Sequence, residues 1–154
     1  MTRVNVPFRV GITGKRIFED GGASVRAALR DCFALLDERF GDGPKTLMTG
    51  LAIGADTIAA EVALDRGWTV VGVLPFQLDE YLTNYSDDEA TKLRELLARD
   101  KVTTIVLDPL RDPATEAPST IDALRLEPDG SSNPLRSRHY EQAGFFIAER
   151  CALG

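Results

Sequence analysis

Residues 45–76 read KTLMTGLAIGADTIAAEVALDRGWTVVGVLPF, and this stretch decides the fold. A short apolar run ends at Thr49-Gly50, and a turn of small residues then opens a helical pattern that stops at Gly67. A second apolar run ends at Pro75. The pattern predicts a strand, a glycine-containing turn, a helix and a second strand. Open α/β sheets bind phosphate-bearing ligands at such strand-to-helix turns, so the stretch also indicates where a ligand would lie.

The rest of the chain repeats this alternation of apolar runs and helical patterns. Strands are predicted at 8–13, 46–49, 68–74 and 101–107, and helices at 24–40, from 55 to the stop at 67, 86–99 and from 134 or 135 to 151. Ser86 and Glu89 have the spacing of a capping box, which marks the start of the third helix. We expect loops at 76–87 and 108–133, the second interrupted by a short helix around 120–126.

This order of elements predicts a Rossmann-like, three-layer α/β/α fold with a mainly parallel sheet, in one domain spanning 1–154. We expect strand order 3-2-1-4, which brings the ends of the first two strands to one edge. A doubly wound sheet normally adds a strand after the last helix, so we expect this domain to lack its final strand. The 101–107 strand would then be an open edge, on which a second copy of the chain could pair.

Composition sets the broad class of protein. The 154 residues are 44% hydrophobic and 27% charged, with a mean hydropathy of -0.12, as in soluble globular domains. No apolar run approaches the ~18 residues of a membrane span, and the first residues do not resemble a signal peptide, so we expect a cytoplasmic protein without a membrane partner. The net charge of -6 argues against a general nucleic-acid binder.

Reactive side chains are few. The first helix is expected to bury Val25, Ala28, Leu29, Cys32, Leu35 and Leu36. On that pattern Cys32 and Cys151 are buried free thiols. His139 is the single histidine, and no nearby motif supports it as a catalytic base. No Cys/His spacing indicates a metal site, and we expect no cofactor.

The turn at 49–56 has two interpretations. Gly50 and Gly54 let the backbone approach a ligand, and the first amides of the following helix are free to bind an anion, which favours a phosphate cradle. Alternatively, the glycines serve only to pack a tight turn. Asp56 would repel a phosphate placed on it, so we expect its carboxylate to accept ribose hydroxyls or to organise the turn.

Three other segments reach the same edge of the sheet. Thr13-Gly14-Lys15-Arg16 follows the first strand and either supplies two cations to a phosphate or is a solvated loop. Phe76 closes the third strand and either stacks on a base or plugs the end of the core. Arg136, Arg138 and Tyr140 open the last helix. The candidate ligand-binding residues are Gly11, Thr13, Gly14, Lys15, Arg16, Thr49, Gly50, Leu51, Gly54, Ala55, Asp56, Pro75, Phe76, Arg138 and Tyr140.

These segments resemble a known group. GITGKR at 11–16, TGLAIGAD at 49–56, VLPF at 73–76 and the last helix with Arg138, Tyr140 and Ile147-Ala148 are similar to the SLOG superfamily. That group unites the DNA-processing protein A Rossmann domain, the lonely-guy phosphoribohydrolases and nucleotide-sensing domains. The resemblance implies a Rossmann-like domain that binds a nucleotide or nucleotide-derived ligand at the edge described above.

The sequence also departs from the enzymes of that group. It contains no P-G-G-x-G-T-x-x-E run, which supplies the catalytic glutamate of the phosphoribohydrolases. We therefore expect a binding or sensing domain and assign no catalytic residue. One alternative is a hydrolase of the nucleotide N-glycosidic bond, with Asp56 or Glu61 as its carboxylate. Another is a single-stranded DNA-binding module, which the acidic balance disfavours.

Overall fold

The computed structural model describes residues 7–14 and 16–151, and it has the expected three layers. The strands are β1 (Phe8–Ile12), β2 (Lys45–Thr49), β3 (Thr69–Leu74) and β4 (Val102–Val106). The helices are α1 (Ala23–Phe40), α2 (Ala55–Asp65), α3 (Leu78–Leu82), α4 (Asp87–Leu97), α5 (Ile121–Leu124) and α6 (Pro134–Arg150). No helix in the described ranges is both long and apolar enough to cross a membrane.

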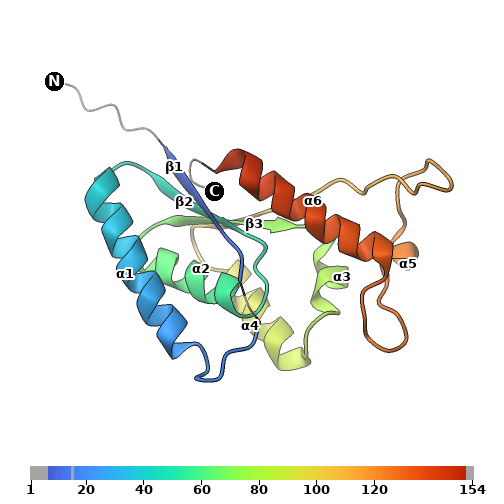
Figure 1. Cartoon of the computed structure of the whole chain (residues 1–154), viewed down its shortest axis with the longest axis horizontal. Helices are drawn as coiled ribbons and strands as arrows, with labels where there is room; N and C mark the ends of the chain where they lie inside the picture. The colour runs from blue at the N-terminus through green and yellow to red at the C-terminus, as the bar shows by residue number, and fades with distance from the viewer. Residues whose placement is uncertain (1–6, 15, 152–154) are drawn as a thin grey trace.

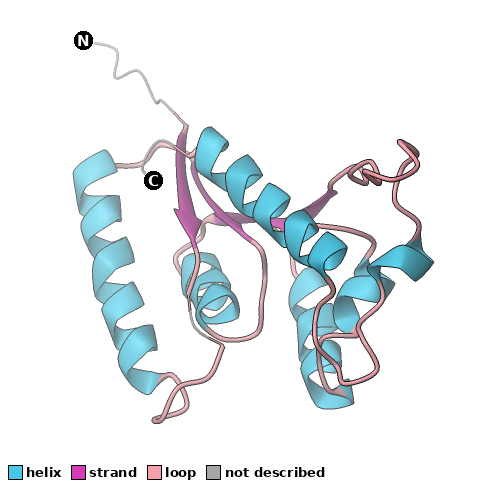
Figure 2. Ribbon diagram, turned by 45° about the vertical axis from the view of Figure 1, so that its right-hand side comes forward, coloured by secondary structure: helices cyan, strands magenta, loops and turns pink. Residues whose placement is uncertain are grey.

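All four strands are parallel, and their order is β1-β2-β3-β4, so the expected order 3-2-1-4 is wrong. β4 pairs with β3, from Val70 opposite Val102 to Leu74 opposite Val106. Each crossover therefore moves one strand further in the same direction. Because such crossovers are right-handed, they place α1, α2 and α4 on one face of the sheet. α6 lies on the opposite face, against β1 and β3 (Figures 1 and 2).

The observed strand order moves the predicted ligand-binding edge within the sheet, but the same segments form it. β1 is an edge strand rather than a central one. Ile12 pairs with Thr49 at the carboxyl ends of β1 and β2, and the next strand, β3, ends two residues beyond the pairing of Thr49 with Gly72. The loops after β1, β2 and β3 therefore still leave the sheet at one edge, beneath α6. β4 is the other edge strand, as expected, and its residues 103–106 are exposed.

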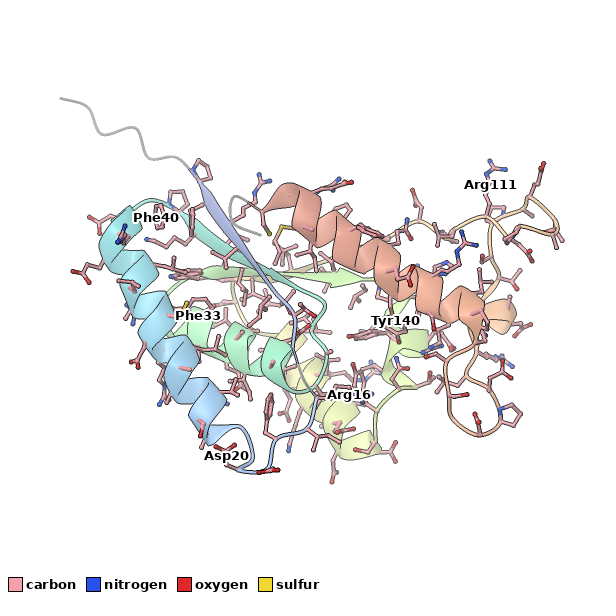
Figure 3. All side chains as sticks on the ribbon, in the orientation of Figure 1. Arg16, Asp20, Phe33, Phe40, Arg111 and Tyr140 are labelled. Carbon is pink, nitrogen blue, oxygen red and sulfur yellow. The ribbon has the colours of Figure 1, made fainter. Side chains whose placement is uncertain are left out.

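The rotation of α1 differs from the sequence prediction. Phe33 is 2% exposed and packs against Trp68 with ring centroids 4.7 Å apart, and it faces the rest of the molecule in Figure 3. This contact turns the helix so that Cys32 is exposed and Leu35 is 55% exposed. α1 has apolar residues on two adjoining faces, and the large aromatic ring takes the buried one. The expectation of a buried thiol is thus wrong for Cys32, and Cys151 is half-buried.

Residues 76–87, predicted to be a loop, contain the short helix α3. Its Tyr81 and Leu82 are buried, so tertiary packing rather than helical propensity stabilises it. The predicted start of the next helix is confirmed: the Ser86 hydroxyl caps the Glu89 amide, and the Glu89 carboxylate accepts from the Ser86 amide. The short helix in the second loop is also confirmed, as α5 with Thr120 as its cap.

The close approach of α6 to β1 depends on Gly11. A Cβ atom at this position would lie 2.8 Å from Ile147 Cγ2 and 3.0 Å from Cys151 Sγ. Met48, Val73 and Ala143 are buried nearby, in the smaller of the two apolar cores. A glycine in β1 therefore lets α6 rest directly on the strand.

We predict that Gly11→Ala destabilises the protein by about 1–3 kcal/mol, because the added methyl group overpacks this contact. Urea unfolding measures the change. Ile147→Ala removes the nearest clashing atom, so Gly11→Ala should cost less in the Ile147→Ala background than in the wild type. An equal cost in both backgrounds would contradict the proposed contact.

Candidate functional site

The turn between β2 and α2 adopts a conformation that few residues tolerate. Leu51 has a φ of 56° and Gly54 a φ of 121°, and the second value belongs to a region used almost only by glycine. The Thr49 hydroxyl accepts a hydrogen bond from the Leu51 amide at 3.1 Å. The Tyr81 hydroxyl, from α3, donates to the Gly50 carbonyl at 2.6 Å. The turn is therefore held from within and from a neighbouring helix.

Leu51 anchors the turn in the core. Its side chain is fully buried, and a Cβ at Gly72 would lie only 2.3 Å from Leu51 Cδ1. Gly72 in β3 thus leaves room for this side chain over the sheet. The buried leucine offsets the backbone strain of its positive φ, since its apolar area is removed from water.

Two further amide groups of the turn have partners within the protein. The Gly54 amide donates to the Thr57 hydroxyl at 3.2 Å, and the Thr57 amide donates to the Ala52 carbonyl at 3.3 Å. The Asp56 carboxylate is buried in the turn, beside the Thr49 hydroxyl and the amides of Ala52 and Gly50, which favour its charged form. The chain's own carboxylate therefore occupies the position that an anion would take at this helix start.

Burial raises the pKa of Asp56 to about 6, from an ordinary value of 3.8, and those neighbouring polar groups limit the rise. The cause is desolvation, which disfavours the charged form. The protonated carboxyl consequently stabilises the folded state below pH 3.8, and this contribution is lost as the pH rises through 6. A carboxyl shifted in this way marks a candidate functional group.

We predict that Asp56→Asn stabilises the protein more at pH 8 than at pH 4, by about 2–3 kcal/mol, because the ionised carboxylate is the costly form in the fold. The free energy of unfolding of both proteins, measured with urea at the two pH values, gives this difference. A stability increment that does not change with pH would contradict the raised pKa.

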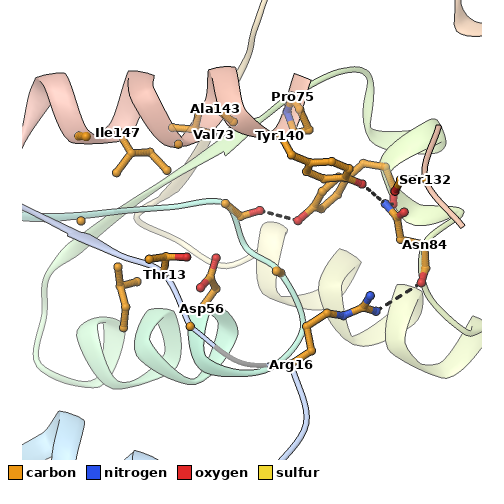
Figure 4. Close-up of a pocket in the computed structure, with 18 of the residues that line it drawn as sticks. Thr13, Arg16, Asp56, Val73, Pro75, Asn84, Ser132, Tyr140, Ala143 and Ile147 are labelled. Atoms are coloured by element: carbon orange, nitrogen blue, oxygen red, sulfur yellow. Dashed lines mark hydrogen bonds between the residues drawn. The ribbon is translucent and has the colours of Figure 1, made fainter. Parts of the chain in front are cut away.

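A cavity of about 600 Å³ opens between this turn and α6 (Figure 4). It lies at the carboxyl edge of β1, β2 and β3, with α6 as its roof. Its size is within the range of small-molecule sites. It is lined by Gly11, Ile12, Thr13, Gly14, Arg16, Gly50, Ala52, Asp56, Val73, Pro75, Tyr81, Asn84, Tyr85, Ser132, Tyr140, Ala143, Gly144, Ile147, Ala148 and Cys151.

The structure brings eight of the predicted site residues to this cavity: Gly11, Thr13, Gly14, Arg16, Gly50, Asp56, Pro75 and Tyr140. Thr49, Leu51, Ala55 and Phe76 are buried and do not line it. Gly54 is the buried cap of α2, and Arg138 is exposed on α6. Lys15 lies outside the described residues. The close packing of Gly14, where a Cβ would lie 2.5 Å from Ala55 Cβ, joins the loop after β1 to the start of α2.

Two further polar side chains of α6 are structural, and only the first of them was a predicted ligand contact. Arg136 is fully buried and pairs with Glu80 at 2.6 Å, and its guanidinium lies 4.6 Å above the Phe76 ring. His139 is also fully buried: its Nδ1 donates to the Leu135 carbonyl at 2.8 Å and its Nε2 accepts from the Leu110 amide at 3.1 Å. Both side chains fix α6 to neighbouring segments, so neither is available to a ligand.

The sequence analysis missed one wall of the cavity, formed by Tyr81, Tyr85 and Asn84. Tyr81 and Tyr85 have the i, i+4 spacing of one helix face, which was the signal for a shared direction. The Arg16 guanidinium lies 4.8 Å from the centre of the Tyr85 ring and donates to the Asn84 carbonyl at 3.4 Å. Burial raises the pKa of both tyrosines, so their hydroxyls stay protonated.

The roof of the cavity is formed by residues of α6 that were not among the candidate ligand-binding residues. Ala143, Gly144, Ile147 and Ala148 follow one face of α6 and line the cavity; only Ala143 is fully buried. Small residues at helical spacing gave this signal, but the same pattern is typical of helix packing. Ser132, from the loop before α6, was also missed.

Comparison with protein-family models and with curated proteins finds no match to this chain. Within the described ranges, no group of three His, Cys, Asp or Glu side chains is placed to hold a metal ion.

Proposed function

We propose that this protein binds a nucleotide or nucleotide-derived ligand in the cavity beneath α6, as a binding or sensing domain. The observation that carries the proposal is the convergence of Asp56, Arg16 and Tyr140 on one cavity at the carboxyl edge of a parallel sheet. Ligands of open α/β sheets bind at this edge. The resemblance of residues 11–16, 49–56 and 73–76 to the SLOG superfamily supports the same ligand class.

The ribose is assigned to Asp56. Its buried carboxylate repels phosphate while it is ionised, and it lies beside the amides of Gly50 and Ala52, which favour its charged form. A carboxylate can instead accept hydrogen bonds from vicinal hydroxyls. A ribose can therefore bind to Asp56 without any change in the turn, because the carboxylate stays where a phosphate would otherwise bind.

The phosphate is assigned to Arg16 and the base to the tyrosine wall. Arg16 is exposed at the cavity, and it is the one cationic side chain among the described lining residues. Its guanidinium can bind a phosphate in a bidentate manner. The rings of Tyr85 and Tyr140, both partly exposed at the cavity, offer flat faces of the kind on which bases stack.

Filling the cavity tests this proposal. A Cβ at Gly144 would meet no atom within 4 Å, so Gly144→Leu extends into the cavity from its roof without a backbone clash. We predict that this variant folds at least as stably as the wild type, because glycine costs about 1 kcal/mol in a helix. It should lose binding of the tightest ligand among AMP, GMP, CMP, UMP and NAD, as measured by calorimetry.

Gly144→Ala is the matched control. It gives the same helical gain with little occupied volume and should keep its affinity within about threefold. Absence of binding by the wild type to every member of the panel would overturn the proposed function. Undiminished binding by Gly144→Leu would show that the ligand lies elsewhere.

N-glycosidic cleavage of a nucleotide is the second candidate function, favoured by the raised pKa of Asp56. A carboxyl that titrates near 6 can accept a proton from water or stabilise a cationic sugar in the transition state. The other carboxylate considered from the sequence, Glu61, pairs with Arg26 at 2.5 Å and does not line the cavity. Asp56 is thus the carboxylate on which this candidate depends.

We predict for this candidate that chromatography detects free base released from AMP, GMP, CMP or UMP, and that Asp56→Asn abolishes the release. Glu61→Gln lies outside the cavity and should keep the wild-type rate. Release that survives Asp56→Asn, or that Glu61→Gln removes equally, would contradict the role of Asp56.

A further inference from the structure

The three tyrosine hydroxyls at the cavity differ in whether they donate a hydrogen bond to the protein. Tyr81 donates to the Gly50 carbonyl at 2.6 Å, and Tyr85 donates to the Tyr81 oxygen at 3.2 Å. A carbonyl can only accept, so the direction of this chain is fixed. The protons of Tyr81 and Tyr85 are therefore committed to the protein, and a ligand cannot receive them.

Asn84 fixes the opposite arrangement at Tyr140. The Arg136 guanidinium, which only donates, lies 3.1 Å from Asn84 Oδ1. The amide nitrogen of Asn84 must then face the other way, and it donates to the Tyr140 hydroxyl at 2.6 Å and to the Tyr81 carbonyl at 2.7 Å. Tyr140 accepts this bond, so its own proton is directed away from Asn84.

This orientation originates in the buried core. Arg136 is fully buried and is held by the Glu80 carboxylate at 2.6 Å and by the Leu124 carbonyl at 2.7 Å. It cannot exchange its donors for acceptors, since guanidinium stays protonated. Arg136 thus donates both to Glu80 and to Asn84, and Asn84 donates onward to Tyr140, so the hydrogen bonds from Arg136 to the cavity have a single possible direction. Figure 4 shows the last of them, between Asn84 and Tyr140.

We propose that Tyr140 donates a hydrogen bond to the bound ligand, and that the cavity therefore selects a heterocyclic base with an acceptor, a carbonyl oxygen or ring nitrogen, at that end. Asn84 is the positioning residue for this bond. The proposal rests on the proposed function and adds to it which end of the cavity donates a hydrogen bond and which end accepts one. Asp56 requires a donor from the ligand, and Tyr140 requires an acceptor. A nucleoside supplies both, through its ribose hydroxyls and its base.

The test is Tyr140→Phe, which removes the hydroxyl and keeps the ring. Calorimetry uses the tightest binder among AMP, GMP, CMP and UMP. Tyr140→Phe should weaken binding about tenfold, the worth of one hydrogen bond. Thermal melting checks that the variant folds.

Asn84→Asp tests the positioning role. An aspartate beside Arg136 stays ionised and can only accept hydrogen bonds. It would therefore accept a hydrogen bond from the Tyr140 hydroxyl, which reverses the direction of this bond. This variant should also lose about tenfold in affinity in the wild-type background, with no further loss in the Tyr140→Phe background. A loss that adds to that of Tyr140→Phe would overturn the positioning role of Asn84.

The outcomes distinguish failure of the proposed function from failure of the donor role of Tyr140. If neither the four nucleotides nor NAD binds the wild type, the proposed function fails and this inference fails with it. If a nucleotide binds and Gly144→Leu blocks it, but Tyr140→Phe binds as tightly as the wild type, the cavity is the binding site and the inference alone is overturned.

Discussion

The buried carboxylate of Asp56 is the constraint around which this site is built. It sits at the first turn of α2 among donors from Thr49, Gly50 and Ala52, and its position fixes the course of the backbone from β2 into the helix. The Tyr81 hydroxyl binds the same turn through the Gly50 carbonyl. A charge placed here is expensive at neutral pH. Buried carboxylates with a raised pKa are commonly found at binding and catalytic sites.

The cavity depends on the same turn from the other side. Leu51 enters the core above Gly72, and Gly14 packs against Ala55, so the loops after β1 and β2 are held together beneath α6. The carboxylate and the roof of the cavity thus belong to one arrangement. Its polar groups come from the turn and the tyrosine wall, and its apolar surface comes from α6 and the strand ends.

The sequence was sufficient for features that depend on local pattern. The βαβ unit at 45–76, the capping box at Ser86 and the short helix after Thr120 follow from spacing and side-chain type, and the structure confirms them. The rotation of α1 was not accessible, because it depends on the contact of Phe33 with Trp68, 35 positions further along the chain. The sheet order has the same origin, since both positions for β4 fit the apolar pattern.

The candidate site was predictable in part for similar reasons. Asp56, Arg16 and Tyr140 were found because strand ends of a parallel sheet converge. Arg136 was misassigned because its ion pair with Glu80 joins segments that no local pattern connects. The wall formed by Tyr81, Tyr85 and Asn84 was missed because α3 is stabilised by these contacts and has only weak helical signals of its own.

Because the crossovers of this sheet all run in one direction, the larger apolar core and the roof of the cavity lie on opposite faces of the sheet. Three long helices and most of the apolar core lie on one face, while α6 covers the other and forms the roof of the cavity (Figure 1). Residues such as Gly144 and Ala148 can therefore vary with little effect on the larger core. A fold arranged in this way lets natural variation or protein engineering reshape the cavity through one helix, while the stability of the protein is maintained by the others.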